Sequence, residues 1–186
     1  MELSPELKFG LLNGWVPLVF FYVVFGILLM SFPKSVVVRL YDRSGWTKTQ
    51  RILSVAGKIF IVSWLFLVIF TPLVIDRAVF FLGAFLYALG LIGFALALLN
   101  YKDTPPDQPV TRGFYRISRN PQQVSILVAF FGISLAVGSW LAVLLIAVGA
   151  VAAHVRVLAE ERSCLAQYGA SYESYMKRVP RYFVFF

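Results

Sequence analysis

The chain alternates between long apolar blocks and short polar segments. Three blocks of membrane-spanning length come first, at residues 11–32, 52–75 and 79–99. Each has about the 20 residues that an α-helix needs to cross the hydrocarbon core of a bilayer. A fourth apolar stretch runs from residue 122 to residue 158. The pattern therefore predicts an all-α, polytopic membrane protein.

The fourth stretch is too long for a single crossing. As one helix it would extend roughly 55 Å, whereas the hydrocarbon core is about 30 Å thick. Gly138 and Ser139 near its middle favour a turn. We therefore expect two short helices, at residues 122–137 and 140–158, that pair as a tight hairpin and bring the number of spans to five. One long tilted helix is the alternative.

The distribution of basic residues supports five spans. These residues gather at 34–51, at 100–120 and after residue 161. All three segments fall on one face only if the chain crosses five times. The positive-inside rule then makes that face cytoplasmic and places the N-terminus outside. The short turn at Asp76 and Arg77 would join the second and third spans as a hairpin.

Composition narrows the class of protein further. Of the 186 residues, 60% are hydrophobic, against about 45–50% apolar residues in soluble domains. The net charge is +8, and the basic residues that produce it lie in short segments beside the spans. This position indicates contact with membrane lipids and not with nucleic acid. One cysteine and one histidine exclude a multi-cysteine or histidine-rich metal site, so we expect no metal. We expect one integral-membrane domain over residues 1–186, in a prokaryotic inner membrane or, alternatively, the endoplasmic reticulum.

A basic loop precedes the fourth stretch and carries the first candidate site. From Thr111 it reads TRGFYRISRNPQQ. Pro121 suits the first turn of the next helix, with Asn120 as its cap. A helix N-terminus beside Arg116 and Arg119 suits a carboxylate or a phosphate. A basic membrane-surface loop without a ligand is the alternative.

A second polar group ends the last apolar stretch. Arg156 and Glu160 are four residues apart, so they share a helix face and are able to pair. Glu161 points about 100° away from Glu160. Acidic groups near bilayer depth are costly unless they are paired or face a polar cavity, which makes them functional candidates. The alternative is that the helix has simply reached water.

The tail after Glu161 predicts an amphipathic helix with an aromatic stripe. The stripe comprises Leu165, Tyr168, Tyr172, Tyr175 and Val179. Such a helix lies in the membrane interface, packs on the domain, or covers a cytoplasmic pocket as a lid. In the third span, small residues at Gly83, Gly90 and Gly93 allow close helix packing or the approach of a ligand, and packing is the commoner case.

Together these pieces resemble the integral-membrane methyltransferases of the isoprenylcysteine carboxyl methyltransferase and phospholipid methyltransferase superfamily. The resemblance covers about residues 83–182. It is carried by the order Gly-Phe-Tyr-Arg (113–116), Arg-Asn-Pro (119–121), an apolar hairpin, Arg156, Glu160-Glu161, Tyr168-Gly169, Tyr172, Tyr175 and Arg-Val-Pro (178–180). It implies S-adenosylmethionine as methyl donor and a lipophilic, prenyl- or lipid-like acceptor that enters from the bilayer and reacts at the cytoplasmic face.

The resemblance also implies roles for individual residues. The cofactor site would be lined by Tyr115, Arg116, Arg119, Asn120, Pro121, Gln122, Gln123, Glu160 and Glu161, with Gly90 and Gly93 approaching from the third span. Arg156, Glu160 and Glu161 would be catalytic, with Arg156 orienting an acceptor carboxylate. Tyr172 and Tyr175 would contact the substrate.

Two departures from the family pattern leave the acceptor open. Asn120 stands where the family usually has histidine, and Gln123 where it usually has tyrosine. Asparagine can hydrogen-bond but cannot act as a base near neutral pH. An amine acceptor would need a base, so the scarcity of histidine slightly favours a carboxylate or thiol-like acceptor.

Two other classes of function remain as alternatives. One is an NADPH-dependent membrane enone or sterol reductase, in which Arg112, Arg116 and Arg119 would bind the phosphates. The other is a non-catalytic relative, scaffold or transporter-like protein, although few charges lie within the spans.

Overall fold

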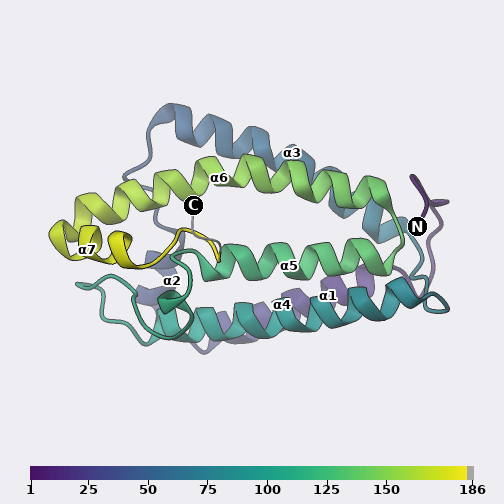
Figure 1. Cartoon of the computed structure of the whole chain (residues 1–186), viewed down its shortest axis with the longest axis horizontal. Helices are drawn as coiled ribbons and strands as arrows, with labels where there is room; N and C mark the ends of the chain where they lie inside the picture. Colours follow the sequence, from purple (N-terminus) through teal and green to yellow (C-terminus); the bar gives the residue numbers. More distant parts are fainter. Residues whose placement is uncertain (184–186) are drawn as a thin grey trace.

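The computed structural model describes residues 1–183. The described residues form seven α-helices and one short 3-10 helix, η1 (Figure 1). Their bounds are α1 Trp15–Met30, α2 Lys34–Tyr41, α3 Lys48–Phe70, α4 Ala78–Lys102, η1 Gly113–Arg116, α5 Pro121–Ala136, α6 Trp140–Tyr168 and α7 Ala170–Arg178. The prediction of an all-α fold is confirmed. The helix α2 was not predicted, and it lies within the first basic segment.

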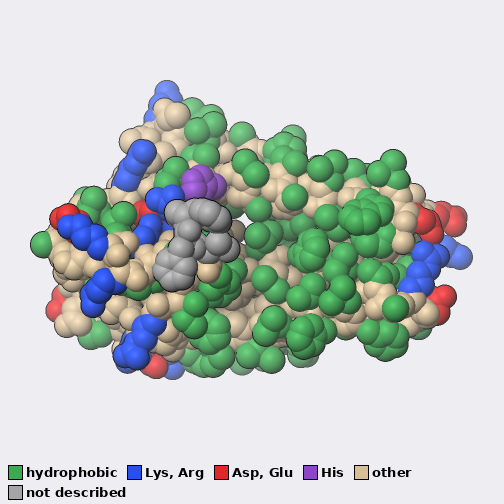
Figure 2. All heavy atoms as spheres, in the orientation of Figure 1, with side chains coloured by type: hydrophobic (Ala, Val, Ile, Leu, Met, Phe, Trp, Pro, Cys, Tyr) green, Lys and Arg blue, Asp and Glu red, His purple; other side chains and the backbone are tan. Residues whose placement is uncertain are grey.

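The apolar helices run along the long axis of the molecule and alternate in direction between its two ends (Figure 1); they are α1, α3, α4, α5 and α6. Of these, α3, α4 and α6 are long and apolar enough to cross a membrane, whereas α1 and α5 are apolar helices of 16 residues. Figure 2 shows apolar side chains over the middle of the visible face and charged side chains gathered at both ends. The end that holds α2, η1 and α7 carries the larger group of Lys and Arg.

The predicted break in the fourth apolar stretch is confirmed. The helix α5 ends at Ala136, and Gly138 has a φ of +66°, a conformation that only glycine adopts readily. Ser139 then caps α6, because its hydroxyl accepts a hydrogen bond of 3.1 Å from the backbone N–H of Ala142. The N-terminal segment covers this turn through backbone hydrogen bonds of Glu2 to Gly138 and Trp140.

The closest helix pairs differ from the predicted ones. The helix α4 packs most closely on α5, and α3 packs most closely on α6, so neither predicted hairpin is the tightest pair. Small residues explain this choice. Gly83 of α4 lies against Gly132 of α5, and Gly57 of α3 lies against Ala152 of α6. Backbones approach closely where side chains are small, and packing of this kind drives helix association in membranes.

An aromatic contact in the core joins α3 to α5. The rings of Trp64 and Phe130 are stacked with centroids 4.6 Å apart. The indole N–H of Trp64 donates a 2.8 Å hydrogen bond to the hydroxyl of Ser134, which in turn donates to the carbonyl oxygen of Phe130. The buried indole is therefore satisfied, as a polar group without water requires.

The last long helix extends further than predicted. It continues past residue 158 to Tyr168, and it stops at Gly169, whose φ is +53°. Glycine adopts a positive φ without steric cost, so it suits a position where the helix ends. The predicted amphipathic tail is consequently divided, with its first part in α6 and the rest in α7. Tyr172 and Tyr175 form the buried face of α7.

Candidate functional site

The basic loop and the C-terminal helix meet around Tyr115 of η1. This side chain is buried, and its hydroxyl accepts a 2.9 Å hydrogen bond from the side-chain amide of Gln122. The hydroxyl of Tyr175 donates a 2.7 Å bond to the backbone carbonyl of Tyr115. Three predicted site residues from different segments are thus brought together, and the tyrosines of α7 pack inward against the loop.

A buried ion cluster lies beside these aromatic side chains. The guanidinium Nε of Arg119 lies 2.9 Å from Oε1 of Glu161, and a terminal nitrogen of Arg181 lies 2.9 Å from Oε2. The side chains of Glu161 and Arg119 are only 5% and 8% exposed. Asn120 adds its amide, which donates to Glu161 and to the backbone carbonyl of Arg181. We call these four residues the inner cluster.

The inner cluster fastens the segment after α7 to the loop. A terminal nitrogen of Arg119 donates to the carbonyl oxygens of Met176 and Val179, and its backbone N–H donates to Pro180. Ser118 donates from its hydroxyl to the carbonyl oxygen of Arg181. The Nε and one terminal nitrogen of Arg119 therefore donate to groups of the protein itself. Both oxygens of Glu161 are likewise occupied, so this carboxylate is a structural anchor in the arrangement seen here.

Asn120 stands at the N-cap position of α5 and Pro121 in the first turn, as predicted, but the side chain of Asn120 makes no capping hydrogen bond. Its amide is turned toward the inner cluster instead. The cap position was readable from the sequence because proline marks the first turn. The orientation was not, since it depends on Glu161, which is 41 residues away.

Glu160 is accessible to solvent, whereas Glu161 is buried. Arg156 and Glu160 form the predicted pair, with Nε and Oε1 2.8 Å apart, and their side chains are 42% and 41% exposed. Successive helical residues point in different directions, so Glu160 reaches the surface while Glu161 faces the inner cluster. We call Arg156 and Glu160 the outer pair. A ligand can reach the outer pair without breaking the inner cluster.

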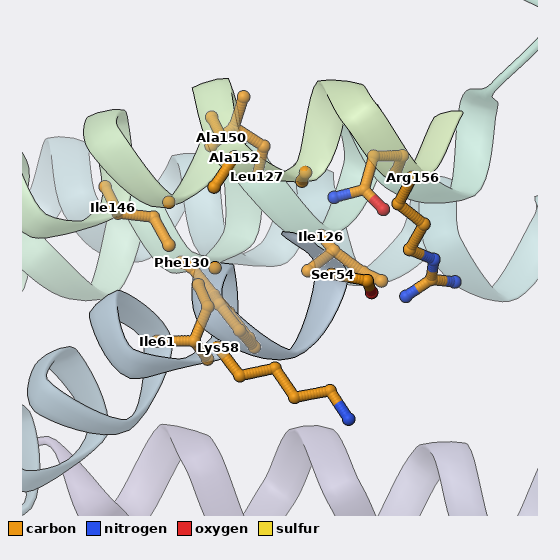
Figure 3. A pocket seen from close by; sticks show the side chains of 14 residues that line it. Ser54, Lys58, Ile61, Ile126, Leu127, Phe130, Ile146, Ala150, Ala152 and Arg156 are labelled. Atoms are coloured by element: carbon orange, nitrogen blue, oxygen red, sulfur yellow. The ribbon is translucent and has the colours of Figure 1, made fainter. Parts of the chain in front are cut away.

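A cleft of about 190 Å³ opens next to the outer pair, between α3, α5 and α6. Its polar residues are Ser54, Lys58, Gln123 and Arg156, and its apolar walls include Ile61, Phe130 and Ile146. Figure 3 shows the polar ends of Lys58 and Arg156 toward one side of the cleft, and Ile61 and Ile146 toward the other. The cleft is therefore amphipathic, with a polar mouth and an apolar interior.

The sequence reasoning missed Lys58. It lies ten residues into α3, within an apolar block that was treated as uninterrupted. A lysine at that depth is costly unless it reaches the interface or faces a polar cavity, so its position alone could have marked it as a candidate. Ser54 and Ile61, four residues before and three residues after Lys58, place the same face of α3 on the cleft.

The predicted substrate residues Tyr172 and Tyr175 are buried at 6% and 3% exposure. They belong to a cluster with Tyr115 and Ala97. Burial raises the pKa of each of these three tyrosines well above the usual 10, so all three stay neutral at physiological pH. Within the arrangement seen here they support the loop, and none of them is suited to act as a base.

The remaining predicted residues are divided. Gln123 lines the cleft, and Arg116 is exposed on η1. Gly90 and Gly93 are buried against Ala129 and Ser125 of α5, which supports the packing interpretation over contact with a cofactor. Within residues 1–183, no group of three or more His, Cys, Asp or Glu side chains is placed to hold a metal ion.

The three long apolar helices and the apolar middle of the molecule define an integral membrane protein. A family model described as phospholipid methyltransferase matches residues 55–171, which is more than half of the chain. The protein belongs to this family. The match includes the outer pair and every residue of the cleft except Ser54. No curated protein and no solved structure matches the chain significantly.

Proposed function

We propose that the protein transfers a methyl group from S-adenosylmethionine to a lipophilic, prenyl- or lipid-like acceptor at the cytoplasmic face of the membrane. The observation that carries this proposal is the family match, because it encloses an amphipathic cleft beside an accessible Arg–Glu pair. A charged donor from the cytosol and an apolar acceptor from the bilayer can meet only where polar and apolar surfaces adjoin. The mouth of the cleft is such a place.

The residues at this mouth fit the donor in part. Glu160 offers a half-exposed carboxylate to an ammonium group or to ribose hydroxyls, and Gln123 offers an amide. The predicted ligands Arg119, Asn120 and Glu161 are already satisfied by one another. We therefore assign Glu160 to donor binding. The inner cluster is assigned to holding the loop before α5 and the segment after α7 in place on α6.

When bound, the donor supplies an activated methyl group, so the protein's task is mainly to align the acceptor. Arg156 would orient an anionic group on the acceptor, since its terminal nitrogens project toward the cleft mouth. An amine acceptor would also need to lose a proton. The buried tyrosines cannot take it, which leaves Glu160 as the nearest accessible base.

The same proposal includes the membrane topology. Five crossings, with the N-terminus external and the C-terminus in the cytoplasm of a prokaryote, agree with five apolar helices that alternate between two ends. The basic segments around α2, η1 and α7 would then lie at the cytoplasmic face. The segments of 16 residues span about 24 Å as helices, so α1 and α5 would need their flanking residues to complete a crossing.

Calorimetric titration of the detergent-purified protein with S-adenosylhomocysteine tests the proposed donor site. We expect saturable binding that weakens at least about tenfold in Glu160→Gln, the effect of losing one hydrogen bond to a charged group. The matched control is Glu173→Gln, because Glu173 also forms an exposed i,i+4 pair, with Lys177 at 2.9 Å. It should bind as the wild type does.

Three results would count against the proposal. Wild-type protein that binds no S-adenosylhomocysteine would remove the donor, and binding of NADPH in its place would favour the reductase class. Silence toward both would favour a non-catalytic relative. Equal binding by the wild type and Glu160→Gln would keep the donor but displace its site from the outer pair.

A further inference from the structure

The cleft has positive charge that no acidic residue of its lining balances. Lys58 and Arg156 both line it, and no acidic residue does. Arg156 gives its Nε–H to Glu160. Among residues 1–183, the terminal nitrogens of Arg156 and the ammonium group of Lys58 have no hydrogen-bonding or salt-bridge partner. Glu160 balances Arg156, so Lys58 leaves one uncompensated positive charge at the mouth, and this favours an anionic ligand there.

Lys58 lies within a membrane span, where a charged side chain costs free energy unless it reaches the interface or a polar group. It is exposed and lies six residues after Ile52, where the apolar block begins, which is about 9 Å along α3 at the usual helical rise. A lysine inside a span reaches for the interface or for a polar cavity, and such residues mark substrate paths. Here the cavity is the cleft, whose lining Lys58 shares with Arg156.

The interior of the cleft has the character of an acyl-chain site. Ile61, Phe130 and Ile146 form its apolar walls, and small residues of α6, among them Ala150 and Ala153, leave the space open. An occupant that matches both parts has one anionic group and at least one apolar chain. Water-soluble anions would leave the apolar walls without a contact, and neutral lipids would leave Lys58 without a partner.

We propose that Lys58 and Arg156 hold the phosphate or carboxylate of an anionic lipid whose chain enters the cleft between α3, α5 and α6. Resting on the proposed function, this lipid is the methyl acceptor: a nucleophilic atom of its headgroup would bond to the methyl carbon as the methyl–sulfur bond breaks, and neutral S-adenosylhomocysteine would leave. Lys58 is the residue that selects an anionic headgroup over a neutral one. The headgroup then lies next to Glu160, where the donor is assigned.

The test measures binding of a labelled single-chain lipid to the detergent-purified full chain. The probe is lysophosphatidic acid, with unlabelled laurate, lysophosphatidylcholine and monoacylglycerol as competitors. We expect displacement by laurate or excess lysophosphatidic acid and little by the neutral monoacylglycerol. Lys58→Met should weaken binding about tenfold or more, and Lys58→Arg should restore most of it, because a charge-assisted hydrogen bond is lost and regained.

Two controls separate the cleft from general attraction to a basic protein. Lys48→Met removes the same charge from the start of the same helix, outside the cleft, and should bind lipid as the wild type does. Ala150→Leu adds bulk to the cleft without changing charge, and should also weaken lipid binding. Equal effects of Lys48→Met and Lys58→Met, or none from Lys58→Met, would overturn the inference. Displacement by monoacylglycerol as strong as by lysophosphatidic acid would do the same.

A parallel titration with S-adenosylhomocysteine keeps the two proposals separate. Lys58→Met should bind it with unchanged affinity, because the donor is assigned to Glu160 and Gln123 and not to Lys58. Lipid binding that depends on Lys58 in a protein without affinity for the donor would retain the anionic-lipid site and refute the methyltransferase. If the protein binds the donor but Lys58→Met does not change lipid binding, the methyltransferase is retained and the anionic-lipid site is refuted.

Discussion

Replacing Glu161 with alanine should destabilise the protein far more than replacing its neighbour Glu160. Removal of Glu161 leaves the Nε–H of Arg119 without an acceptor at a site where that side chain is 8% exposed. Breaking a buried ion pair costs about 3–5 kcal/mol. Arg119 keeps its two carbonyl acceptors, and Arg181 is 30% exposed and can turn to solvent. We therefore expect about 3 kcal/mol, at the lower end of that range.

Glu160→Ala is the matched comparison, because the same residue type is removed one position away on the same helix. Its pair with Arg156 is about two-fifths exposed, and exposed i,i+4 pairs contribute only about 0.3–0.5 kcal/mol. The assay is thermal unfolding in maltoside, followed by near-UV circular dichroism. A loss of 3 kcal/mol corresponds to a fall of roughly 6–12 °C in Tm for a chain of this size.

A second comparison isolates the buried charge itself. The double variant Arg119→Met with Glu161→Met removes both charges and fills the space with apolar atoms, which can be neutral or even stabilising for buried pairs. Because Arg119→Met also removes the bonds to Met176 and Val179, the double variant should lose less stability than the sum of the two single changes. If Glu161→Ala and Glu160→Ala had the same Tm, the inner cluster would not be a structural anchor, and its assignment here would be refuted.

Two further changes test the helix packing. Gly90→Ala should lower the free energy of unfolding by roughly 1–3 kcal/mol, because the added methyl group would press on the backbone of α5. The control is Gly26→Ala, where the space is open and stability should be equal or higher. Similar losses of stability at both positions would contradict the close α4–α5 contact. Trp64→Phe and Ser134→Ala should show a coupling of about 0.5–1.5 kcal/mol in a double-mutant cycle of unfolding, and additive losses would mean that their 2.8 Å hydrogen bond contributes nothing.

Features that depend on neighbouring residues were predictable from the sequence. The break at Gly138 followed from the length of an apolar stretch and a turn residue, and the pairing of Arg156 with Glu160 followed from helical periodicity. The apolar blocks likewise predicted the long helices. In each case the physical cause lies within a few residues of its effect, so a pattern along the chain is sufficient.

Features that depend on distant partners were not predictable in this way. Nothing near Glu161 in the sequence indicates that Arg119, 42 residues away, would neutralise it. The choice of α5 as the partner of α4 depends on which small residues meet in space. The far end of α6 was missed because the apolar stretch ends at residue 158 while the helix continues in polar sequence to Gly169. Composition marks membrane depth, but it does not mark where a helix stops.

The two consecutive glutamates show how the inner cluster and the open site depend on each other. Because adjacent helical residues point about 100° apart, fixing Glu161 between Arg119 and Arg181 also fixes the direction in which Glu160 faces. Asn120 takes part in this anchoring through its amide, a hydrogen-bonding task that needs no proton transfer. A change at Asn120 therefore affects the inner cluster first. The accessible pair of Arg156 and Glu160, on which the proposed chemistry depends, is left intact.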